Sequence, residues 1–347
     1  MAELYCPLPV SIHPEAFELD ERAAAWMLTC PPFEGEEQRA RLLGSHSGAF
    51  VACGSPHGLR ERLEVGGRWF FLGFAVDDWL ETLALDLVVE ACWAMQRIVE
   101  DPSCGAGSWL PFGSHFAEVF RSMRSMATER QYQHIVVGYR AYHLAIPIET
   151  RHQSCGTMPP LQEQVAIRLG LSLFEAFIAA TEIYNDQSIP DQEYYRADVR
   201  ALREVTAILL CWANDIFSIA KDTREATFSP ASLVCALATE RHCTTQDATE
   251  HAIELWNRTM VLYLKLRDKI SPGVSPQLTR WLGDCDNMIA NIIGWHTSNP
   301  RYDVLVPVTA TATEPEGLST APIPFCARWW TQLGENPASA PTPHSRR

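Results

Sequence analysis

The chain has 347 residues, and 47% of them are hydrophobic. This much apolar material can fill a sizeable packed core, which excludes disorder over most of the length. The formal net charge of −14 repels phosphate backbones, so we expect no nucleic-acid partner. An acidic protein can still bind an anionic ligand when divalent cations bridge the two.

The eleven cysteines are scattered along the chain, and no two of them form a CxxC pair. This pattern indicates free thiols in a cytoplasmic protein, not a disulfide framework or a zinc site. The N-terminus has neither the basic nor the apolar region of a signal peptide. The apolar runs 69–76 and 207–213 are too short to span a bilayer, so we expect no membrane insertion.

Helical patterning dominates the middle of the chain. Residues 1–60 are rich in proline and glycine, and we interpret them as an N-terminal segment that packs on a larger bundle. From there on, apolar residues recur at three- and four-residue spacing, as at Leu80 and Leu83. We find neither alternating strands nor Asn-Gly hairpin turns. The sequence therefore predicts an all-α domain of about ten or more helices over residues 61–302.

Composition changes at the end of the chain, in the extension 303–347. Residues 309–324 are rich in Thr, Ala and Pro, which is typical of a linker or a flexible tail. Residues 325–333 carry two tryptophans, and we expect this stretch to dock onto the domain. Residues 337–347 are predicted to be disordered, so the extension is expected to be partly disordered.

Three acidic residues, Asp77, Asp78 and Glu81, follow the first apolar run. On a helix, Asp77 and Glu81 are four residues apart and point the same way. Acids at the end of an apolar helix repel one another and resist burial unless cations neutralise them. Because Mg²⁺ favours carboxylate oxygens, the motif predicts a metal site. The alternative interpretation is a solvated helix end.

Asn214, Ser218 and Asp222 recur at four-residue spacing after the second apolar run. At about 100° per residue they drift by only about 80° over two turns, so their oxygens share one helix face. An amide oxygen, a hydroxyl and a carboxylate suit one octahedral cation and leave positions for phosphate and water. Lys221 can reach the same phosphate. The alternative is that these are ordinary polar residues of a helix.

Two weaker patterns complete the set. Arg301 and Tyr302 can together donate several hydrogen bonds to a phosphate, although a helix end running into a loop explains them equally. Asn185 and Asp186 begin like the second metal motif, but Ile189 stands where the serine would be. We therefore expect no metal at that dipeptide.

Together these motifs resemble those of the bacterial-type class I terpene synthase family, in the family's order and spacing over about residues 70–302. The resemblance implies a single-domain helical bundle around a central apolar cavity, as a monomer or a homodimer. It implies an isoprenyl diphosphate substrate, farnesyl diphosphate by default, with geranylgeranyl diphosphate as the alternative. It also implies three Mg²⁺ ions, with Mn²⁺ as a substitute, and a lyase reaction that releases diphosphate and cyclises the carbocation to a terpene.

The same resemblance assigns roles residue by residue. The implied metal ligands are Asp77, Asp78, Glu81, Asn214, Ser218 and Asp222, and the implied diphosphate donors are Arg168, Lys221, Arg301 and Tyr302. Arg168 stands 46 residues before Asn214, as the family's diphosphate-sensing arginine does. Two residues depart from the pattern. Leu171 occupies the position of an acidic or hydroxyl linker, and Asp222 is shorter than the usual glutamate.

Aromatic residues near the motifs suit a carbocation, which needs π faces and no nucleophile nearby. Phe74 precedes Asp77 by about one turn, and Phe71 lies a further turn back. The family places cation-stabilising aromatics at positions like Phe74 and Trp295. We expect all three aromatics to contact substrate, with core packing as the alternative.

Two other functions stay open. A chain-elongating prenyltransferase resembles this fold but carries two aspartate-rich motifs, whereas the second motif here is Asn, Ser and Asp. A helical binding protein that has lost catalysis is the other alternative, which the complete ligand set argues against and the departures at Leu171 and Asp222 leave open. The segment Asp284-Cys285-Asp286-Asn287 lacks the last aspartate of the family's class II motif, so we expect no protonation chemistry there.

Overall fold

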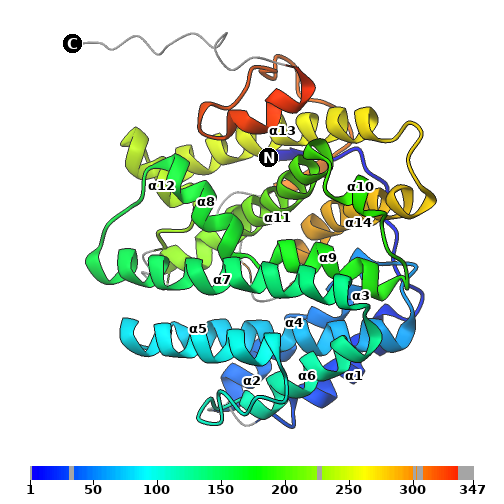
Figure 1. The fold of residues 1–347 in the computed structure, drawn as a ribbon. Helices are drawn as coiled ribbons and strands as arrows, with labels where there is room; N and C mark the ends of the chain where they lie inside the picture. Colours follow the sequence, from blue (N-terminus) through cyan, green and yellow to red (C-terminus); the bar gives the residue numbers. More distant parts are fainter. Residues whose placement is uncertain (1, 31–34, 225–228, 300–301, 303–307, 335–347) are drawn as a thin grey trace.

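Helices make up most of the chain (Figure 1). A computed structural model describes residues 2–30, 35–224, 229–299, 302 and 308–334. At a few of these positions, among them Lys221 and Asp222, only the backbone is described. The predicted all-α class is confirmed. The helices are α1 Ala16–Met27, α2 Glu36–Leu43, α3 Ser47–Gly54, α4 Arg60–Leu80, α5 Leu85–Glu100, α6 Gly113–Met126, α7 Glu129–Cys155, α8 Leu161–Leu171, α9 Phe174–Tyr184, α10 Asp191–Tyr194, α11 Ala197–Arg224, α12 Leu233–Arg241, α13 Thr245–Ile270 and α14 Pro276–Ser298.

Helix α11 runs through the middle of the bundle (Figure 1). Its residues 207–213 are all fully buried, because neighbouring helices α8, α9, α13 and α14 pack around it. Helices α1 and α3 from the N-terminal segment pack on α4, and α5 packs on α7. Apolar packing alone therefore fixes the positions of the two long helices α4 and α11. Among the described helices, none is both long and apolar enough to cross a membrane.

The expectation of no strands is wrong at the chain ends. Strand β1, Ala2–Tyr5, pairs in parallel with β2, Val308–Thr311, and Ala2 lies opposite Val308. The other edge of β1 is bonded to α13, where the Asn257 side chain accepts from Tyr5 N–H at 2.7 Å and donates to Glu3 O at 3.0 Å. Strands of four residues are too short for alternation to be recognised, and their pairing depends on tertiary contact.

The extension after Tyr302 is therefore structured in its described part, 308–334, where a flexible linker was expected over much of its length. The 3₁₀ helix η1, Pro324–Leu333, packs on α8, α11 and α13. Trp329 and Trp330 are buried, and the Trp329 indole N–H donates to Glu204 on α11 at 2.8 Å. Burial of two tryptophans supplies the apolar area that holds the extension down. Residues 335–347 lie outside the described part of the chain.

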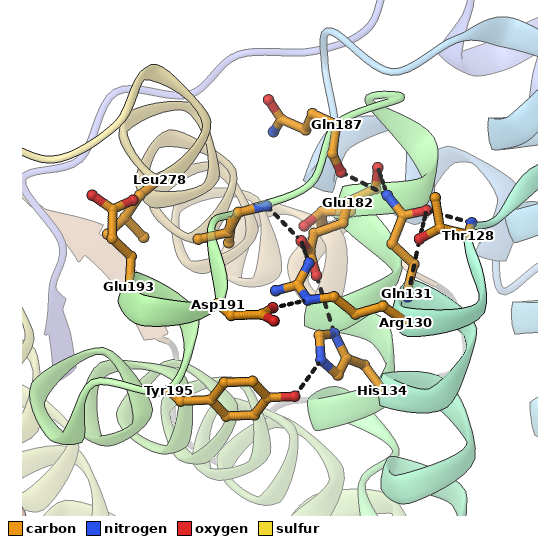
Figure 2. Close-up of polar contacts among 12 residues, drawn as sticks. Thr128, Arg130, Gln131, His134, Glu182, Gln187, Asp191, Glu193, Tyr195 and Leu278 are labelled. Carbon is orange, nitrogen blue, oxygen red and sulfur yellow. Dashed lines mark hydrogen bonds and ion pairs between the residues drawn. The ribbon is translucent and has the colours of Figure 1, made fainter.

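A fully buried carboxylate, Glu182 on α9, ties α7 to the loop that contains Pro190 (Figure 2). Its oxygens accept from Ile189 N–H at 2.8 Å and pair with Arg130 at 3.3 Å and His134 at 3.2 Å. A buried charge costs little only while each of its partners is present. This cluster fixes the turn between α9 and α11, and with it the direction in which α11 enters the bundle.

Replacing Glu182 by alanine is expected to lower the free energy of unfolding by about 3 kcal/mol, because it removes the buried acceptor that Ile189 N–H, Arg130 and His134 share. Urea denaturation at pH 7 measures the change. The exposed Glu240→Ala on α12 is the control and should stay within about 0.5 kcal/mol of the wild type. A similarly small effect of Glu182→Ala would contradict the structural role of the cluster.

Candidate active site

The acidic motif lies at the C-terminal end of α4. The apolar residues Leu72, Ala75, Val76 and Leu80 are buried and hold the helix against the core. Asp77 and Glu81 line a cavity of about 360 Å³, whereas Asp78 is not among the described residues that line it. The C-terminal end of a helix carries a partial negative charge, so acids placed there are unfavourable without a cation. The location of Asp77 and Glu81 thus favours cation binding.

The opposite wall of the same cavity comes from α11. Asn214 and Ser218 line the cavity one turn apart, immediately after the buried run 207–213. Asp222 and Lys221 continue this helix, but their side chains lie outside the described residues, as does the whole of Arg301. The structure therefore brings six of the predicted metal and diphosphate residues to one cavity: Asp77, Glu81, Arg168, Asn214, Ser218 and Tyr302.

A second, apolar lobe of about 140 Å³ continues from the polar one. The two lobes share the lining residues Phe74, Asp77, Arg168, Leu171 and Asn214, so they lie next to each other. The apolar lobe is walled mainly by aromatic rings from the five helices α3, α4, α7, α9 and α14. Its aromatic walls are Phe50, Trp69, Phe70, Phe74, Tyr142, Phe174, Phe177 and Trp295.

Phe74 and Trp295 both line this lobe, and their rings stack with centroids 6.2 Å apart and planes 21° apart. Phe70 lines the lobe and Phe71 does not, so the prediction for Phe71 is corrected within the described residues. Phe71 is fully buried in the core. Helix geometry explains the difference, because Phe70 lies about 40° from Phe74 around the helix axis and Phe71 lies about 60° away on the other side.

A buried ion pair connects α8 to α11. Arg168 contacts the Asp215 carboxylate at 2.7 Å and donates to Asn214 Oδ1 at 2.9 Å. The second oxygen of Asp215 accepts from Leu233 N–H, at the start of α12, at 2.9 Å. Burial alone lowers the pKa of Arg168, but Asp215 raises it above its usual value overall, so the guanidinium stays charged. Sequence reasoning gave Asp215 no role of its own, and here it holds Arg168 in place.

Arg168 is followed directly by a break between two helices. Helix α8 ends at Leu171, and Leu173 adopts a left-handed conformation with φ 55° before α9 begins. Leu171, at the linker position, is the last residue of α8 and contributes apolar surface to both lobes of the cavity.

His296 orients the metal-motif asparagine, a contact that the sequence analysis missed. Its Nδ1 lies 2.8 Å from Ile292 O and donates to it, so Nε2 accepts from Asn214 Nδ2 at 3.2 Å. Burial lowers the pKa of His296 to about 3, which keeps the ring neutral. Tyr302 also accepts from Asn214 Nδ2, at 3.2 Å. Both contacts turn the Asn214 carbonyl oxygen toward Arg168. The one sequence feature that could have indicated this contact is that His296 directly follows Trp295.

Helix α7 forms a third wall of the cavity, and no sequence motif predicted it. Its residues Glu149, Thr150, Gln153 and Ser154 line the polar lobe. Burial, and next the negative charge of Asp77, raise the pKa of Glu149 to about 8. A lone glutamate on a long amphipathic helix carries no distinguishing pattern, so only tertiary packing identifies it.

The donor set fits small hard cations shared between walls. Within the described ranges, no three His, Cys, Asp or Glu side chains cluster closely enough to hold an ion by themselves. Each wall instead offers one or two oxygen donors, from Asp77 and Glu81 on one side and Asn214 and Ser218 on the other. Mg²⁺ accepts such partial sets when phosphate oxygens and water complete its octahedron.

Comparison with known proteins identifies the family. Residues 68–261 match the model described as terpene synthase family 2, C-terminal metal binding. The chain belongs to this terpene synthase family. It is therefore an enzyme, a carbon–oxygen lyase of diphosphate substrates, and a divalent metal is part of its chemistry.

Two curated relatives and one solved structure resemble this terpene synthase over nearly its whole length. A (+)-(1(10)E,4E,6S,7R)-germacradien-6-ol synthase of Streptomyces pratensis is 29% identical, over 95% of this chain and 96% of the relative. Spiroviolene synthase of Streptomyces violens is 27% identical, over 97% and 92%. The crystal structure of the SVS_A2 protein from ancestral sequence reconstruction has a TM-score of 0.82 at 27% identity, over 96% and 100%.

The pKa of Glu149 predicts a pH dependence for the metal-free synthase. A carboxyl group whose folded pKa is raised stabilises the fold below its unfolded pKa, and this contribution is lost as the pH rises through about 8. Glu149→Gln is therefore expected to be more stable than the wild type at pH 8.5 in EDTA, with the difference shrinking toward pH 5. Thermal unfolding of both proteins across this range is the measurement. A difference that is independent of pH would contradict the assignment.

Proposed function

We propose that this terpene synthase ionises a linear isoprenyl diphosphate with the help of Mg²⁺, releases diphosphate and cyclises the resulting carbocation. One observation carries the proposal: oxygen donors of α4 and α11 line the same polar lobe, and an aromatic lobe lies next to it. A diphosphate fits the polar end and its hydrocarbon chain fits the apolar end. The product is a terpene hydrocarbon or alcohol.

The polar lobe holds the diphosphate. Asp77 and Glu81 on α4, and Asn214 and Ser218 on α11, would hold Mg²⁺, with Asp222 completing the second set and Asp78 supporting the first. When bound, the metal neutralises the negative charge that builds up on the leaving diphosphate. We expect three ions, the number that the family resemblance implies.

Cationic and hydroxyl hydrogen-bond donors also bind the leaving diphosphate. Arg168 is held charged by Asp215 at the edge of the polar lobe, and Tyr302 lines the same lobe. We assign Lys221 and Arg301 to the same diphosphate on the strength of their motifs. Donors that are already oriented stabilise the departing charge without reorganisation during the reaction.

The apolar lobe steers the cation. The faces of Phe74 and Trp295 lie where a carbocation leaving the polar lobe would meet them, and ring faces stabilise positive charge. Aromatic walls also exclude water, which would otherwise quench the cation early. We favour farnesyl diphosphate as substrate, the chain length that the family resemblance implies by default, and geranylgeranyl diphosphate is the alternative.

Asp77→Asn and Asn214→Ala are each expected to lower kcat/KM for Mg²⁺-dependent diphosphate release by about 100-fold or more, because each removes a donor from one wall. Circular dichroism should show an intact fold. Asp186→Asn is the matched control, since Asp186 belongs to the second Asn-Asp dipeptide and pairs with Arg62 away from the cavity. Near-wild-type activity of either cavity variant would refute the metal assignment.

The substrate class is tested with C10, C15 and C20 diphosphates, each with and without isopentenyl diphosphate. Cyclic products from a single diphosphate support the proposal. Chain lengthening with isopentenyl diphosphate would instead identify a prenyltransferase. No diphosphate release from any of the three lengths would indicate a protein that has lost catalysis.

Gly73 on α4 leaves open space in the apolar lobe, because a Cβ atom built on it meets nothing within 4 Å. Gly73→Leu is expected to fill that space and to slow the longest accepted diphosphate by about tenfold relative to the C10 substrate, the discrimination typical of a few methylene groups. Gly283→Leu on α14 is the control. A Cβ atom built on Gly283 also meets nothing within 4 Å, but Gly283 lies outside this lobe, so this variant should keep the wild-type preference for chain length. An unchanged preference in Gly73→Leu would exclude this position from the pocket wall.

A further inference from the structure

Phe50 on α3 brings the N-terminal segment into the apolar lobe. Its ring stacks on Phe70 and Phe177, with centroids 4.9 Å and 5.5 Å apart, and lies 5.1 Å from the Trp295 ring. Because Phe50 is buried in a close-packed interior, a shift of α3 must displace the rings around it. The position of α3 therefore sets part of the wall that a carbocation would meet.

Asp20 on α1 fixes the start of α3. Backbone N–H groups in the first turn of a helix have no partner within the helix, and the side chain of the preceding residue often accepts from them. Here the preceding residue is His46, whose side chain does not cap the helix. Asp20 Oδ1 instead accepts from Gly48 N–H at 2.9 Å and from Ala49 N–H at 3.1 Å. The carboxylate also faces the positive end of the helix dipole.

The same carboxylate holds the turn before α3. Asp20 Oδ2 accepts from His46 Nδ1 at 2.9 Å, and the His46 backbone is left-handed, with φ 49°. A residue other than glycine keeps this unfavourable conformation only when its surroundings hold it there. Asp20 is buried and bonds to both the His46 side chain and the first turn that follows, so it supplies that restraint.

This turn also contacts the C-terminal end of α14. The carbonyl of His46 accepts from the Trp295 indole N–H at 3.4 Å, and the carbonyl of Ser45 accepts from Asn299 Nδ2 at 2.9 Å. The Asn299 carbonyl in turn accepts from Tyr302 N–H at 3.1 Å. One turn is thus bonded to an aromatic residue of the apolar lobe and to the segment that carries Tyr302 into the polar lobe.

Helices α1, α3 and α4 pack closely enough to pass a displacement from one to the next (Figure 1). A Cβ atom built on Gly48 would lie 2.7 Å from Asp20 Cα, and one built on Gly67 of α4 would lie 3.2 Å from Gly48 Cα. Backbones in such close contact have no flexible side chain between them to absorb a shift.

We infer that Asp20 is a positioning residue for cyclisation, which rests on the proposed function because it requires a cation steered in the apolar lobe. Asp20 holds α3 and the turn before it, and these hold Phe50 and Trp295 in the shape that folds the substrate. Within the described residues, Asp20 lines neither lobe. Its loss should therefore change which product forms more than how fast diphosphate leaves.

Product analysis with Mg²⁺ and the C15 or C20 diphosphate that the wild type cyclises tests this role. Asp20→Ala is expected to raise the ratio of acyclic to cyclic products by about tenfold, because a loosened wall folds the cation poorly and admits water. The rate of diphosphate release should fall by less than about threefold, since the groups that bind diphosphate are retained. Asp20→Asn keeps an acceptor for both α3 amides and should restore most of the wild-type ratio.

Two further variants separate positioning from general loss of stability. Asn257→Ala removes the bonds that hold β1 to α13, so it should lower Tm without changing the product ratio. His46→Gly accommodates φ 49° without strain and keeps the fold, but it removes the bond to Asp20 Oδ2 and should shift products in the same direction as Asp20→Ala.

An unchanged product ratio in folded Asp20→Ala or in His46→Gly overturns the positioning role of Asp20. The same shift in Asn257→Ala as in Asp20→Ala also overturns it, because any loosening of the N-terminal segment would then suffice. Failure of the proposed function is distinct, since it is seen in the wild type alone as absence of cyclic products. Amide hydrogen exchange over residues 47–54 and 292–299 adds a test without substrate, and it should be faster in Asp20→Ala than in Asn257→Ala. Equal exchange in the two variants would contradict the inferred contacts.

Discussion

The buried contact between Arg168 and Asp215 is the constraint on which the site depends. It joins α8 to α11, and through Leu233 N–H it also fixes the start of α12. A buried ion pair offsets the free-energy cost of its desolvation only when every oxygen and N–H around it has a hydrogen-bond partner. Here both carboxylate oxygens of Asp215 have one. The same guanidinium reaches Asn214 Oδ1, so one interaction sets the donor face of α11 and keeps a cation beside the polar lobe.

The polar lobe brings carboxyl groups of like charge together, which is unfavourable, and packing elsewhere in the fold offsets this repulsion. Asp77 and Glu81 lie at the negative end of α4, and Glu149 faces them from α7. Without cations, these carboxyl groups repel one another, and the pKa of Glu149 is raised first by burial and next by the charge of Asp77. Cation binding relieves this repulsion, so the arrangement that destabilises the metal-free fold is the one that favours binding of metal and diphosphate together.

Much of the site could be predicted because its residues recur along single helices. Asp77 and Glu81, and then Asn214 and Ser218, are four apart, and helix geometry alone puts each pair on one face. The class of the fold followed from the same periodicity. Neither motif by itself predicts that the two helix faces meet at one cavity. The family resemblance supplied that expectation, and the structure brings both pairs to one polar lobe.

What the sequence could not show depends on tertiary packing. Glu149 and His296 join the site through neighbours distant in sequence, as do the strands that pair the two chain ends. Phe70 and Phe71 differ by one helical step, and the choice between them follows from the rotation of α4 against α3 and α9. The indole of Trp93 points outward and could not be told from a core residue by spacing.

A crystal structure of the protein with Mg²⁺ and inorganic diphosphate tests the central claim most directly. The account predicts one diphosphate in the polar lobe, with metal ions about 2.1 Å from an oxygen of Asp77 on one side and from Asn214 and Ser218 on the other. Metal bound to one wall alone, or diphosphate bound outside this lobe, would contradict it.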